Sequence, residues 1–411
     1  MLYDIIIIGA GMAGLYCSYK IRKARPDLKV LILEKNGKEM IGGRAGSRQF
    51  YGSTVVIGAG IGRFNKDKLL LSLLKEFGFP INKFIAKSGQ SCDLQGKCFL
   101  KKNFLMLKKN YISRKKAGNC IRETFHDFAL PILGENDYKY FVACSGYTDF
   151  ENSDVHDVFY HYNFDDNYDD LIGFGVPWKK LVEKLVLAIY PIKIKTSNSV
   201  SKISKDKEGK YILRVDELNK NYITNKVVIA TTIQSIMKLI GAQFPIYKQI
   251  HGQPFLRSYG KFSKSSIPIL KQYLTVSTMV GTGPFHKVIK INPDKGIYMF
   301  IYSCNADALY LKKYINNTEK NREFLCRVLE KTFCIKNGLL KMLSMVSFFW
   351  DIGTHYYDPL TGPYKNRIEF IKEAQHPEEN LFVIGEVVGL NQGWTNTVLQ
   401  SVKNIEQKLL N

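Results

Sequence analysis

Three glycines near the N-terminus have the spacing of a phosphate-binding turn. The pattern G-x-G-x-x-G begins at Gly9, directly after the apolar run of residues 2–8. In such a turn the first glycine allows the tight bend, the second lets the backbone approach a pyrophosphate, and the third lets the following helix pack closely. The phosphates would lie at the N-terminus of that helix, where amide N–H groups lack intrahelical partners. The predicted contacts are Gly9, Gly11, Met12, Ala13 and Gly14.

An acidic residue follows at the distance that a dinucleotide site requires. Glu34 lies 20 residues after Gly14 and directly follows a second apolar run, residues 29–33. A carboxylate in this position hydrogen-bonds the ribose hydroxyls of adenosine, and Lys35 stands beside it. Strand, glycine turn, helix, strand and acid together predict a βαβ unit of the Rossmann type. This unit does not distinguish FAD from NAD.

A second glycine motif separates these two cofactors. Gly42, Gly43 and Arg44 follow Glu34 by eight to ten positions. A guanidinium opposite the helix N-terminus would close a clamp on two adjacent phosphates. With this motif the sequence resembles the flavin-containing amine oxidase superfamily and its desaturase relatives, in which the arginine lies against the FAD pyrophosphate. The resemblance implies FAD as the cofactor.

Further segments match the same family in the same order. Residues 54–62 (TVVIGAGIG) are similar to the strand and glycine pair beside the isoalloxazine ring, and Val200 is similar to the valine whose main chain holds adenine. Residues 381–398 are similar to the closing segment, whose Gly-Glu pair contacts the ribityl chain and pyrophosphate. The FAD contacts that the resemblance implies are Gly43, Arg44, Gly58, Ala59, Gly60, Val200, Gly385, Glu386, Trp394 and Thr395.

The substrate half resembles the family in one short segment. Residues 350–359 (WDIGTHYYDP) are similar to the segment that brings an aromatic residue to the flavin face. Tyr356, or Tyr357 with the register one residue off, would face Trp394 across the substrate nitrogen. Such an electron-rich pair favours an amine by cation–π attraction. Ordinary core aromatics are an equal alternative in a chain with 13% aromatic residues.

The resemblance also implies a reaction. Many relatives hold a water near flavin N5 with a lysine, for which Lys290 is the candidate, so the catalytic residues implied are Lys290, Tyr356 and Trp394. Thr354 and His355 stand where relatives with covalent flavin have a cysteine, which implies noncovalent FAD. The expected reaction is hydride transfer from a small amine to flavin N5, with oxygen as the acceptor.

Two alternatives to amine oxidation remain open. One is an FAD-dependent desaturase or oxidase of a non-amine substrate. The other is a flavin-binding protein with a structural or partner-docking role and little turnover, because a fold does not by itself imply an activity.

The chain is strongly basic, with a formal net charge of +22 over 411 residues. Lysine, asparagine and isoleucine are all abundant, which an AT-rich coding sequence would also produce. Binding to nucleic acid or to an anionic surface is therefore the less favoured interpretation, since no arginine-rich tract or zinc finger accompanies the charge.

One window runs against this basic composition. No lysine or arginine lies between Lys139 and Lys179. A solvated loop is the favoured interpretation, and an electrostatic funnel for a cationic substrate is the alternative. The acidic residues of the window are Asp149, Glu151, Asp154, Asp157, Asp165, Asp166, Asp169 and Asp170.

Eight cysteines are scattered without a CxxC pair or a cluster at zinc spacing. We therefore expect free thiols, no metal site and, with no secretory signal pattern, a cytoplasmic location. The longest apolar stretch, residues 5–15, is short and rich in glycine. No transmembrane segment is expected, since a spanning helix needs roughly 20 apolar residues.

These patterns predict an α/β protein in which a Rossmann-like FAD-binding domain is interleaved with a mixed α+β substrate domain. The predicted FAD-binding domain comprises residues 1–64, 175–233 and 359–411. The predicted substrate domain comprises residues 65–174 and 234–358. Two domains are expected because single hydrophobic cores stop growing near about 250–300 residues.

Overall fold

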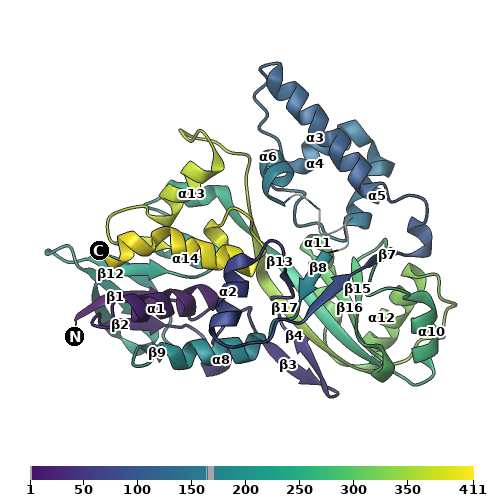
Figure 1. The fold of residues 1–411 in the computed structure, drawn as a ribbon, viewed down its shortest axis with the longest axis horizontal. Coiled ribbons are helices and arrows are strands. Elements are labelled where there is room, and N and C mark those ends of the chain that lie inside the picture. Colours follow the sequence, from purple (N-terminus) through teal and green to yellow (C-terminus); the bar gives the residue numbers. More distant parts are fainter. Residues whose placement is uncertain (1, 163, 165–170) are drawn as a thin grey trace.

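A seven-stranded sheet forms one half of the molecule (Figure 1). The computed structural model describes residues 2–162, 164 and 171–411. Six strands follow the order β10-β11-β12-β1-β2-β9, and β18 pairs with the second half of β12. The strands are β1 (Leu2–Ile8), β2 (Val30–Leu33), β9 (Lys193–Lys195), β10 (Lys202–Lys205), β11 (Tyr211–Val215), β12 (Lys220–Ile229) and β18 (Leu381–Val383).

Both faces of this sheet are covered, which explains the continuous apolar run in β1. Ile5 and Ile7 belong to the core on one face, whereas Ile6 and Ile8 belong to the core on the other. Side chains alternate along a strand, so a strand buried on both faces needs apolar residues throughout. Helices α1 (Met12–Ala24), α2 (Lys68–Glu76), α8 (Trp178–Ala188) and α14 (Thr395–Leu410) cover the first face, and α9 (Ile233–Ile240) and α13 (Arg367–Gln375) cover the second.

A six-stranded sheet of order β17-β13-β16-β15-β14-β7 forms the other half. Its neighbours pair antiparallel except β14 with β7. Helices α10 (Ser266–Tyr273), α11 (Asn305–Leu311) and α12 (Glu319–Thr332) share the core on one of its faces. The strands are β7 (Ser88–Gln90), β13 (Ile250–Phe262), β14 (Thr278–Val280), β15 (Lys287–Asn292), β16 (Ile297–Cys304) and β17 (Met342–Tyr357).

Two small sheets connect these halves. The hairpin of β3 (Ser47–Phe50) and β4 (Ser53–Val56) packs on the face of the six-stranded sheet that carries Tyr259 and Met299. The second small sheet has the order β5-β8-β6. Its strands are β5 (Gly62–Arg63), β6 (Lys83–Ala86) and β8 (Leu171–Phe174).

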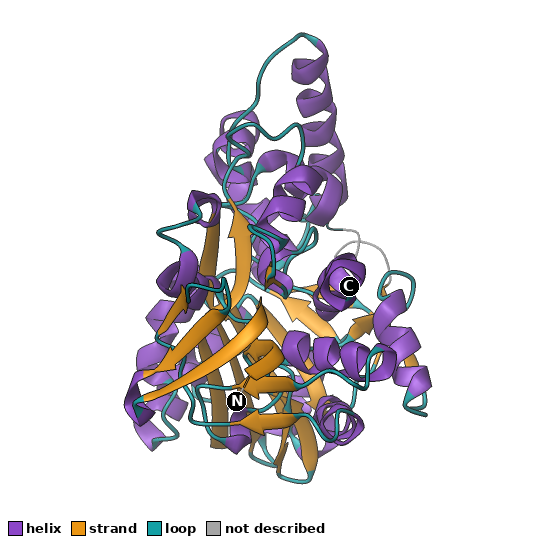
Figure 2. Ribbon diagram, turned by 90° about the vertical axis from the view of Figure 1, so that its left-hand side faces the viewer, coloured by secondary structure: helices purple, strands orange, loops and turns teal. Residues whose placement is uncertain are grey.

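A helical unit stands at the top of the molecule in both views and, in Figure 1, over the half that holds the six-stranded sheet (Figures 1 and 2). It contains α3 (Leu100–Lys116), α4 (Phe125–Leu133), α5 (Glu135–Ser145) and the short α6 (Val155–Asp157). Aromatic rings fill its interior, and T-shaped pairs such as Phe125 with Phe150 recur there, as ring quadrupoles prefer.

The predicted α/β class with a Rossmann-like unit is confirmed by this architecture. Every strand of the seven-stranded sheet lies within residues 1–64, 175–233 and 359–411, and every strand of the six-stranded sheet lies within 65–174 and 234–358. The domain boundaries themselves stay a prediction. In the described part of the chain, no helix combines the length and apolar character needed to cross a bilayer.

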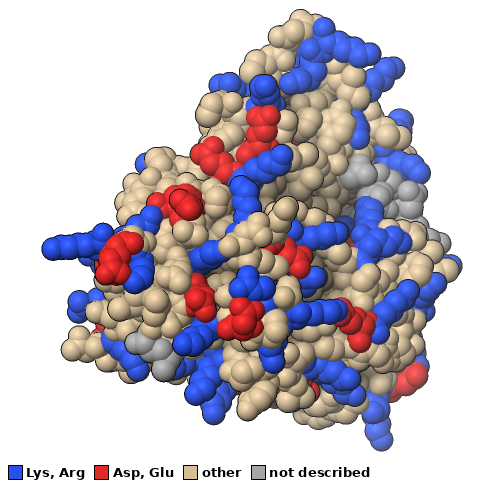
Figure 3. All heavy atoms as spheres, turned by 60° about the vertical axis from the view of Figure 1, so that its left-hand side comes forward, with Lys and Arg blue, Asp and Glu red and all other residues tan. Residues whose placement is uncertain are grey.

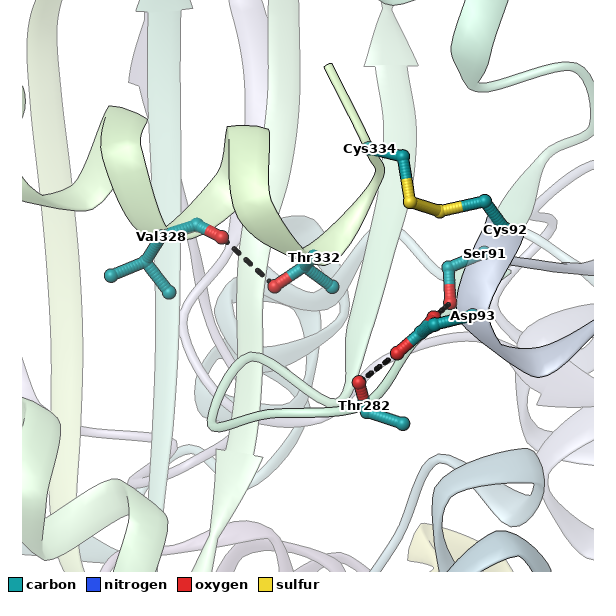
Figure 4. Close-up of a disulfide and its surroundings, with 7 residues drawn as sticks. All are labelled: Ser91, Cys92, Asp93, Thr282, Val328, Thr332 and Cys334. Atoms are coloured by element: carbon teal, nitrogen blue, oxygen red, sulfur yellow. Dashed lines mark hydrogen bonds between the residues drawn. A yellow bond between two sulfur atoms is a disulfide. The ribbon is translucent and has the colours of Figure 1, made fainter. Parts of the chain in front are cut away.

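Two disulfides correct the expectation of free thiols for four of the eight cysteines, whereas Cys17, Cys120, Cys304 and Cys326 are free. Cys92 pairs with Cys334 and Cys98 with Cys144, at Cα separations of 6.3 and 5.6 Å. The pairs are 242 and 46 residues apart in the sequence, so spacing could not reveal them. Beside Cys92, the Asp93 carboxylate accepts hydrogen bonds from Ser91 and Thr282 (Figure 4). Disulfides persist mainly in oxidising compartments, so the cytoplasmic prediction loses the support that free thiols gave it.

The acidic window is not a solvated loop where the structure describes it. Asp154 and Asp157 are buried and both pair with Arg367. Glu151 accepts a hydrogen bond from Tyr138, 2.8 Å away. Asp165, Asp166, Asp169 and Asp170 lie outside the described residues. Lys and Arg are spread widely over the face seen in Figure 3, including the helical unit at its top, and do not gather into a single stripe.

Candidate active site

The three glycines of the first turn have different neighbours. A Cβ on Gly9 would lie 2.5 Å from the Ala230 carbonyl oxygen, and one on Gly14 would lie 2.0 Å from the Gly9 carbonyl oxygen. A Cβ on Gly11 would meet nothing within 4 Å. Gly9 and Gly14 are therefore required for close packing of strand and helix, whereas Gly11 leaves an open space directly before α1. Met12 and Ala13, the first residues of α1, are buried behind that space.

Glu34 stabilises this turn from the end of β2. Its Oε2 accepts a hydrogen bond from the Ala10 amide at 2.8 Å, and its Oε1 accepts from the amide and side chain of Asn36. The Glu34 carbonyl accepts from the amide of Asn198, two residues before the buried Val200. Glu34 and the segment that carries Val200, both predicted to bind the adenosine part of the cofactor, are therefore neighbours. Lys35, which was also predicted to contact the cofactor, is exposed.

The second glycine motif lies against the first. The Gly42 amide donates to the Ala10 carbonyl at 2.8 Å, and a Cβ on Gly43 would lie 3.5 Å from the Gly11 Cα. Gly43 has a φ of +59°, a conformation that favours glycine. Arg44 extends from this turn, and its Nη1 donates to the Gly353 carbonyl at 2.5 Å.

Glu386 joins Arg44 to the six-stranded sheet. Its Oε2 lies 3.3 Å from Arg44 Nη1 and 2.5 Å from His355 Nδ1, and its Oε1 accepts from the amides of His355 and Gly393. His355 Nε2 accepts from the Ile233 amide, which leaves the ring proton on Nδ1 to be donated to Glu386. Burial alone would raise the pKa of Glu386, but the hydrogen bonds from His355 and attraction to Arg44 hold this pKa well below its usual value.

The glycine segment after β4 is held by backbone and indole contacts. A Cβ on Gly58 would lie 2.5 Å from the Arg44 carbonyl oxygen, which also accepts from the Ala59 amide at 2.8 Å. The Gly60 carbonyl accepts a 2.7 Å hydrogen bond from Trp178 Nε1. Any side chain at Gly58 would therefore separate this segment from the Arg44 turn.

Trp394 lies at the start of the last helix, where it caps α14 before Thr395. The guanidinium of Arg63 stacks 3.6 Å from the centre of the Trp394 ring and also pairs with Asp67 at 2.8 Å. Because Arg63 is itself fixed by Asp67, the indole is held in one orientation. The residue before Trp394, Gly393, has a φ of +88° and donates its amide to Glu386.

Tyr356 and Trp394 are not brought into contact in the described residues. The Tyr356 ring stacks on His251 at 5.1 Å, and Tyr357 is buried with its hydroxyl donating to the Gly389 carbonyl at 3.0 Å. Thr354 is instead the neighbour of Gly393, since a Cβ there would lie 3.8 Å from the Thr354 methyl. That Tyr356 faces Trp394 across the substrate nitrogen stays a prediction.

Lys290 stays a prediction with no geometric support. It lies on β15, and its Nζ donates to the Thr275 carbonyl at 3.1 Å on the exposed side. Two strands, β16 and β13, separate β15 from the strand that carries Thr354. The buried lysine of β15 is Lys287, whose Nζ lies 3.2 Å from the centre of the Tyr147 ring.

Known proteins match the chain at two scales. A family model described as an NAD(P)-binding Rossmann-like domain matches residues 7–77. A thiamine thiazole synthase from Uromyces fabae is 64% identical over 33 residues, which are 8% of this chain and 10% of that protein. A solved structure, described as a putrescine oxidase double mutant with redesigned cofactor binding, has a TM-score of 0.68 at 12% identity and covers 100% of this chain and 99% of its own.

The chain shares the fold of that putrescine oxidase over its full length. The resemblance stated from the sequence is therefore confirmed for the fold over the full length. Because the likeness rests on 12% identity, it says nothing of the substrate.

A small cavity of about 40 Å³ lies beside Thr354 and Gly393. Asp149, Asp157 and His161 also line it. Burial raises the pKa of Asp157 to about 7, although attraction to Arg367 opposes the shift. Burial likewise lowers the pKa of His161 to about 4, so this imidazole is neutral at pH 7. The space is sufficient for a few water molecules.

Gln253 is a polar neighbour of this cavity that sequence patterns did not single out. Its Nε2 donates to the Asp149 carbonyl at 2.9 Å and to Thr354 Oγ1 at 3.1 Å. Its Oε1 is buried and has no hydrogen-bond partner in the described structure. Such an acceptor is costly unless a ligand or water donates to it.

Arg44 offers a direct test of the phosphate clamp in this fold. Arg44→Ala should weaken FAD retention by roughly 10–100-fold, the range for losing a charged hydrogen bond. Arg44→Lys should lose less, because it keeps the charge but not the planar fork. FAD per chain after gel filtration measures the difference. Equal retention in both variants would contradict the clamp.

Proposed function

We propose that the chain is an FAD-dependent oxidoreductase that oxidises an amine. The open space at Gly11 carries the proposal, because it lies at the N-terminus of α1 between two glycines that cannot accept a side chain. Backbone amides and the helix dipole favour a phosphate there. The residues that would hold the dinucleotide are Gly9, Gly11, Met12, Ala13, Gly14, Glu34, Lys35, Gly43, Arg44, Gly58, Ala59, Gly60, Val200, Gly385, Glu386, Trp394 and Thr395.

Glu34 and Arg44 fit this role by chemistry as well as position. Glu34 is a buried carboxylate at the end of the second parallel strand, where ribose hydroxyls would be bound. Arg44 starts from a turn beside Gly11, and exchanging its contact with the Gly353 carbonyl for a phosphate would strengthen its hydrogen bonds. In this proposal residues 1–64, 175–233 and 359–411 form the FAD-binding domain.

FAD held by these residues would supply two-electron chemistry. The amine would lose a hydride from its carbon and become an imine that water hydrolyses, and oxygen would take up the two electrons and leave as hydrogen peroxide. The chain itself would orient the amine and exclude water. Trp394, held by Arg63, would supply a rigid aromatic wall. With Thr354 in the place of a cysteine, the flavin would be bound noncovalently.

The cavity beside Thr354 supports an amine as the substrate. Asp149 and Asp157 line it, and Gln253 contacts two lining residues, Asp149 and Thr354, through its Nε2. A substrate amine would donate a hydrogen bond to the carboxyl group of Asp149 or Asp157, which can accept whether it is ionised or protonated.

Purified protein should be yellow, and acid should release its FAD intact. Oxygen consumption should then rise with an accepted amine in a panel of mono- and polyamines. Flavin that stays on the denatured chain would contradict noncovalent binding. A yellow protein that consumes no oxygen with any amine would favour a desaturase or a flavin-binding protein with little turnover.

A further inference from the structure

Arg257 is a buried cation on the face of the six-stranded sheet that meets the Gly58–Gly60 segment. Only 5% of its surface is exposed. Its guanidinium lies over Gly60, because a Cβ there would be 3.3 Å from Nη2 and 3.5 Å from Nη1. Gly60 belongs to the segment proposed to pass beside the flavin ring. Arg257 therefore lies where that segment and the six-stranded sheet meet.

Aromatic rings, and no carboxylate, surround this guanidinium in the part of the chain that the structure describes. Its Cζ lies 5.0 Å from the centre of the Phe255 ring and 4.8 Å from that of Tyr302. Its Nε is buried and has no hydrogen-bond partner. Cation–π contacts offset only part of the cost of removing a charge from water.

The other buried arginines show how this chain treats a structural guanidinium. Arg63 is 4% exposed and pairs with Asp67 at 2.8 Å. Arg367 is 2% exposed and pairs with Asp157 at 2.6 Å and with Asp154 at 3.1 Å. A buried charge without such a partner is strongly unfavourable. Arg257 differs from both because no acidic side chain compensates it.

We infer that Arg257 binds a carboxylate of the substrate, so the oxidised amine is one that also carries a carboxylate. This inference rests on the proposed amine oxidation. The planar guanidinium matches a carboxylate with two parallel hydrogen bonds. Arg257 would then hold the carboxylate end of the substrate beside the Gly58–Gly60 segment.

Matched ligands that differ by one carboxylate test this assignment. L-Lysine is compared with cadaverine, and L-phenylalanine with phenethylamine, by anaerobic calorimetric titration of the full chain after its flavin has been reduced with dithionite, so that ligands bind but are not oxidised. We expect the carboxylate-bearing member of an accepted pair to bind at least about tenfold more tightly, as for a charged bidentate pair. Arg257→Gln should abolish that preference and leave amine binding within about twofold. Arg257→Lys should retain part of it, because the charge remains.

Lys261→Gln is the matched control. Lys261 lies on the same strand, β13, but is less buried and donates to the Lys295 carbonyl, so its loss should leave the preference unchanged. Equal binding of both members to the unmodified chain would overturn the inference, and needs no variant to fold. Loss of flavin from Arg257→Gln would also overturn the inference, because Arg257 would then hold the cofactor. Tighter binding of phosphoethanolamine than of every carboxylate-bearing ligand would overturn it as well, because the anion bound would then be a phosphate.

Binding and turnover separate the two proposals. A chain that prefers carboxylates but consumes no oxygen would refute amine oxidation and support the role of Arg257. A chain that oxidises amines and ignores the carboxylate would refute the role of Arg257 and support amine oxidation.

Discussion

Gly11→Val is expected to abolish FAD binding while the chain still folds. The valine side chain would occupy the space before α1 that a pyrophosphate needs, and it would meet no protein atom near its Cβ. Gly11 has an extended backbone with φ of −73°, which a β-branched residue adopts without strain. FAD per chain should fall to near zero, while the far-ultraviolet circular dichroism stays unchanged.

Two further glycines make this result specific. A Cβ on Gly175 would also meet nothing within 4 Å, and its φ is not left-handed, so Gly175→Val should keep its FAD. Gly14→Ala should instead lower stability itself, because its Cβ would lie 2.0 Å from the Gly9 carbonyl oxygen. Full FAD content in a folded Gly11→Val chain would remove the basis for the dinucleotide site.

Trp394→Ala should slow anaerobic flavin reduction by an accepted amine by about 10–100-fold, or roughly 1.4–2.8 kcal/mol in the barrier. The Arg63 guanidinium lies 3.6 Å from the centre of the Trp394 ring and holds it in place. Without the ring, neither the substrate nor the guanidinium would be held in one orientation. The flavin should remain bound with a nearly normal spectrum. Stopped-flow absorbance measures the rate, and FAD per chain provides the control.

Tyr356→Ala tests whether Tyr356 contacts the substrate opposite Trp394. If Tyr356 faces the substrate nitrogen, its loss should slow reduction as much as the loss of Trp394. Its stacking on His251, which pairs with Asp358 at 2.7 Å, offers the competing explanation of an aromatic that packs away from the substrate. If only Tyr356→Ala keeps the full rate of flavin reduction, Trp394 alone contacts the substrate. If both variants keep the full rate, the desaturase alternative is favoured.

Local patterns made the nucleotide half predictable. The apolar run of residues 2–8 forms β1, and the run of residues 29–33 contains β2, because apolar runs bounded by a glycine turn specify buried strands over short distances.

The substrate half could not be predicted in the same detail. β13 and β17 pair along most of their length, yet their partners are about ninety residues apart, as in Ser258 with Ser347. A register shift between Gln253 and Phe255 changes which residues share a face, and a one-residue slip turns every side chain over. The orientation of Tyr356 relative to Tyr357 was therefore open.

Unsatisfied polar atoms are equally invisible in a sequence. Arg257 and Gln253 are ordinary polar residues of a mixed strand until the fold removes them from water and gives them no full set of partners. His355 appeared in the sequence only as a residue that is not cysteine, whereas the structure pairs it with the predicted Glu386. Such roles are created by burial, which depends on contacts far apart in the chain.

The bond between Cys92 and Cys334 turns the middle of the chain into a covalent ring. β9 to β12 lie inside the ring, whereas β1 and β18 belong to the two free tails and reach β12 from opposite ends of the sequence. One protease cut inside the ring would leave a single molecule on a non-reducing gel, while a cut in either tail would release a fragment. The central strand of the nucleotide half is thus the place where three topologically distinct pieces of one chain meet.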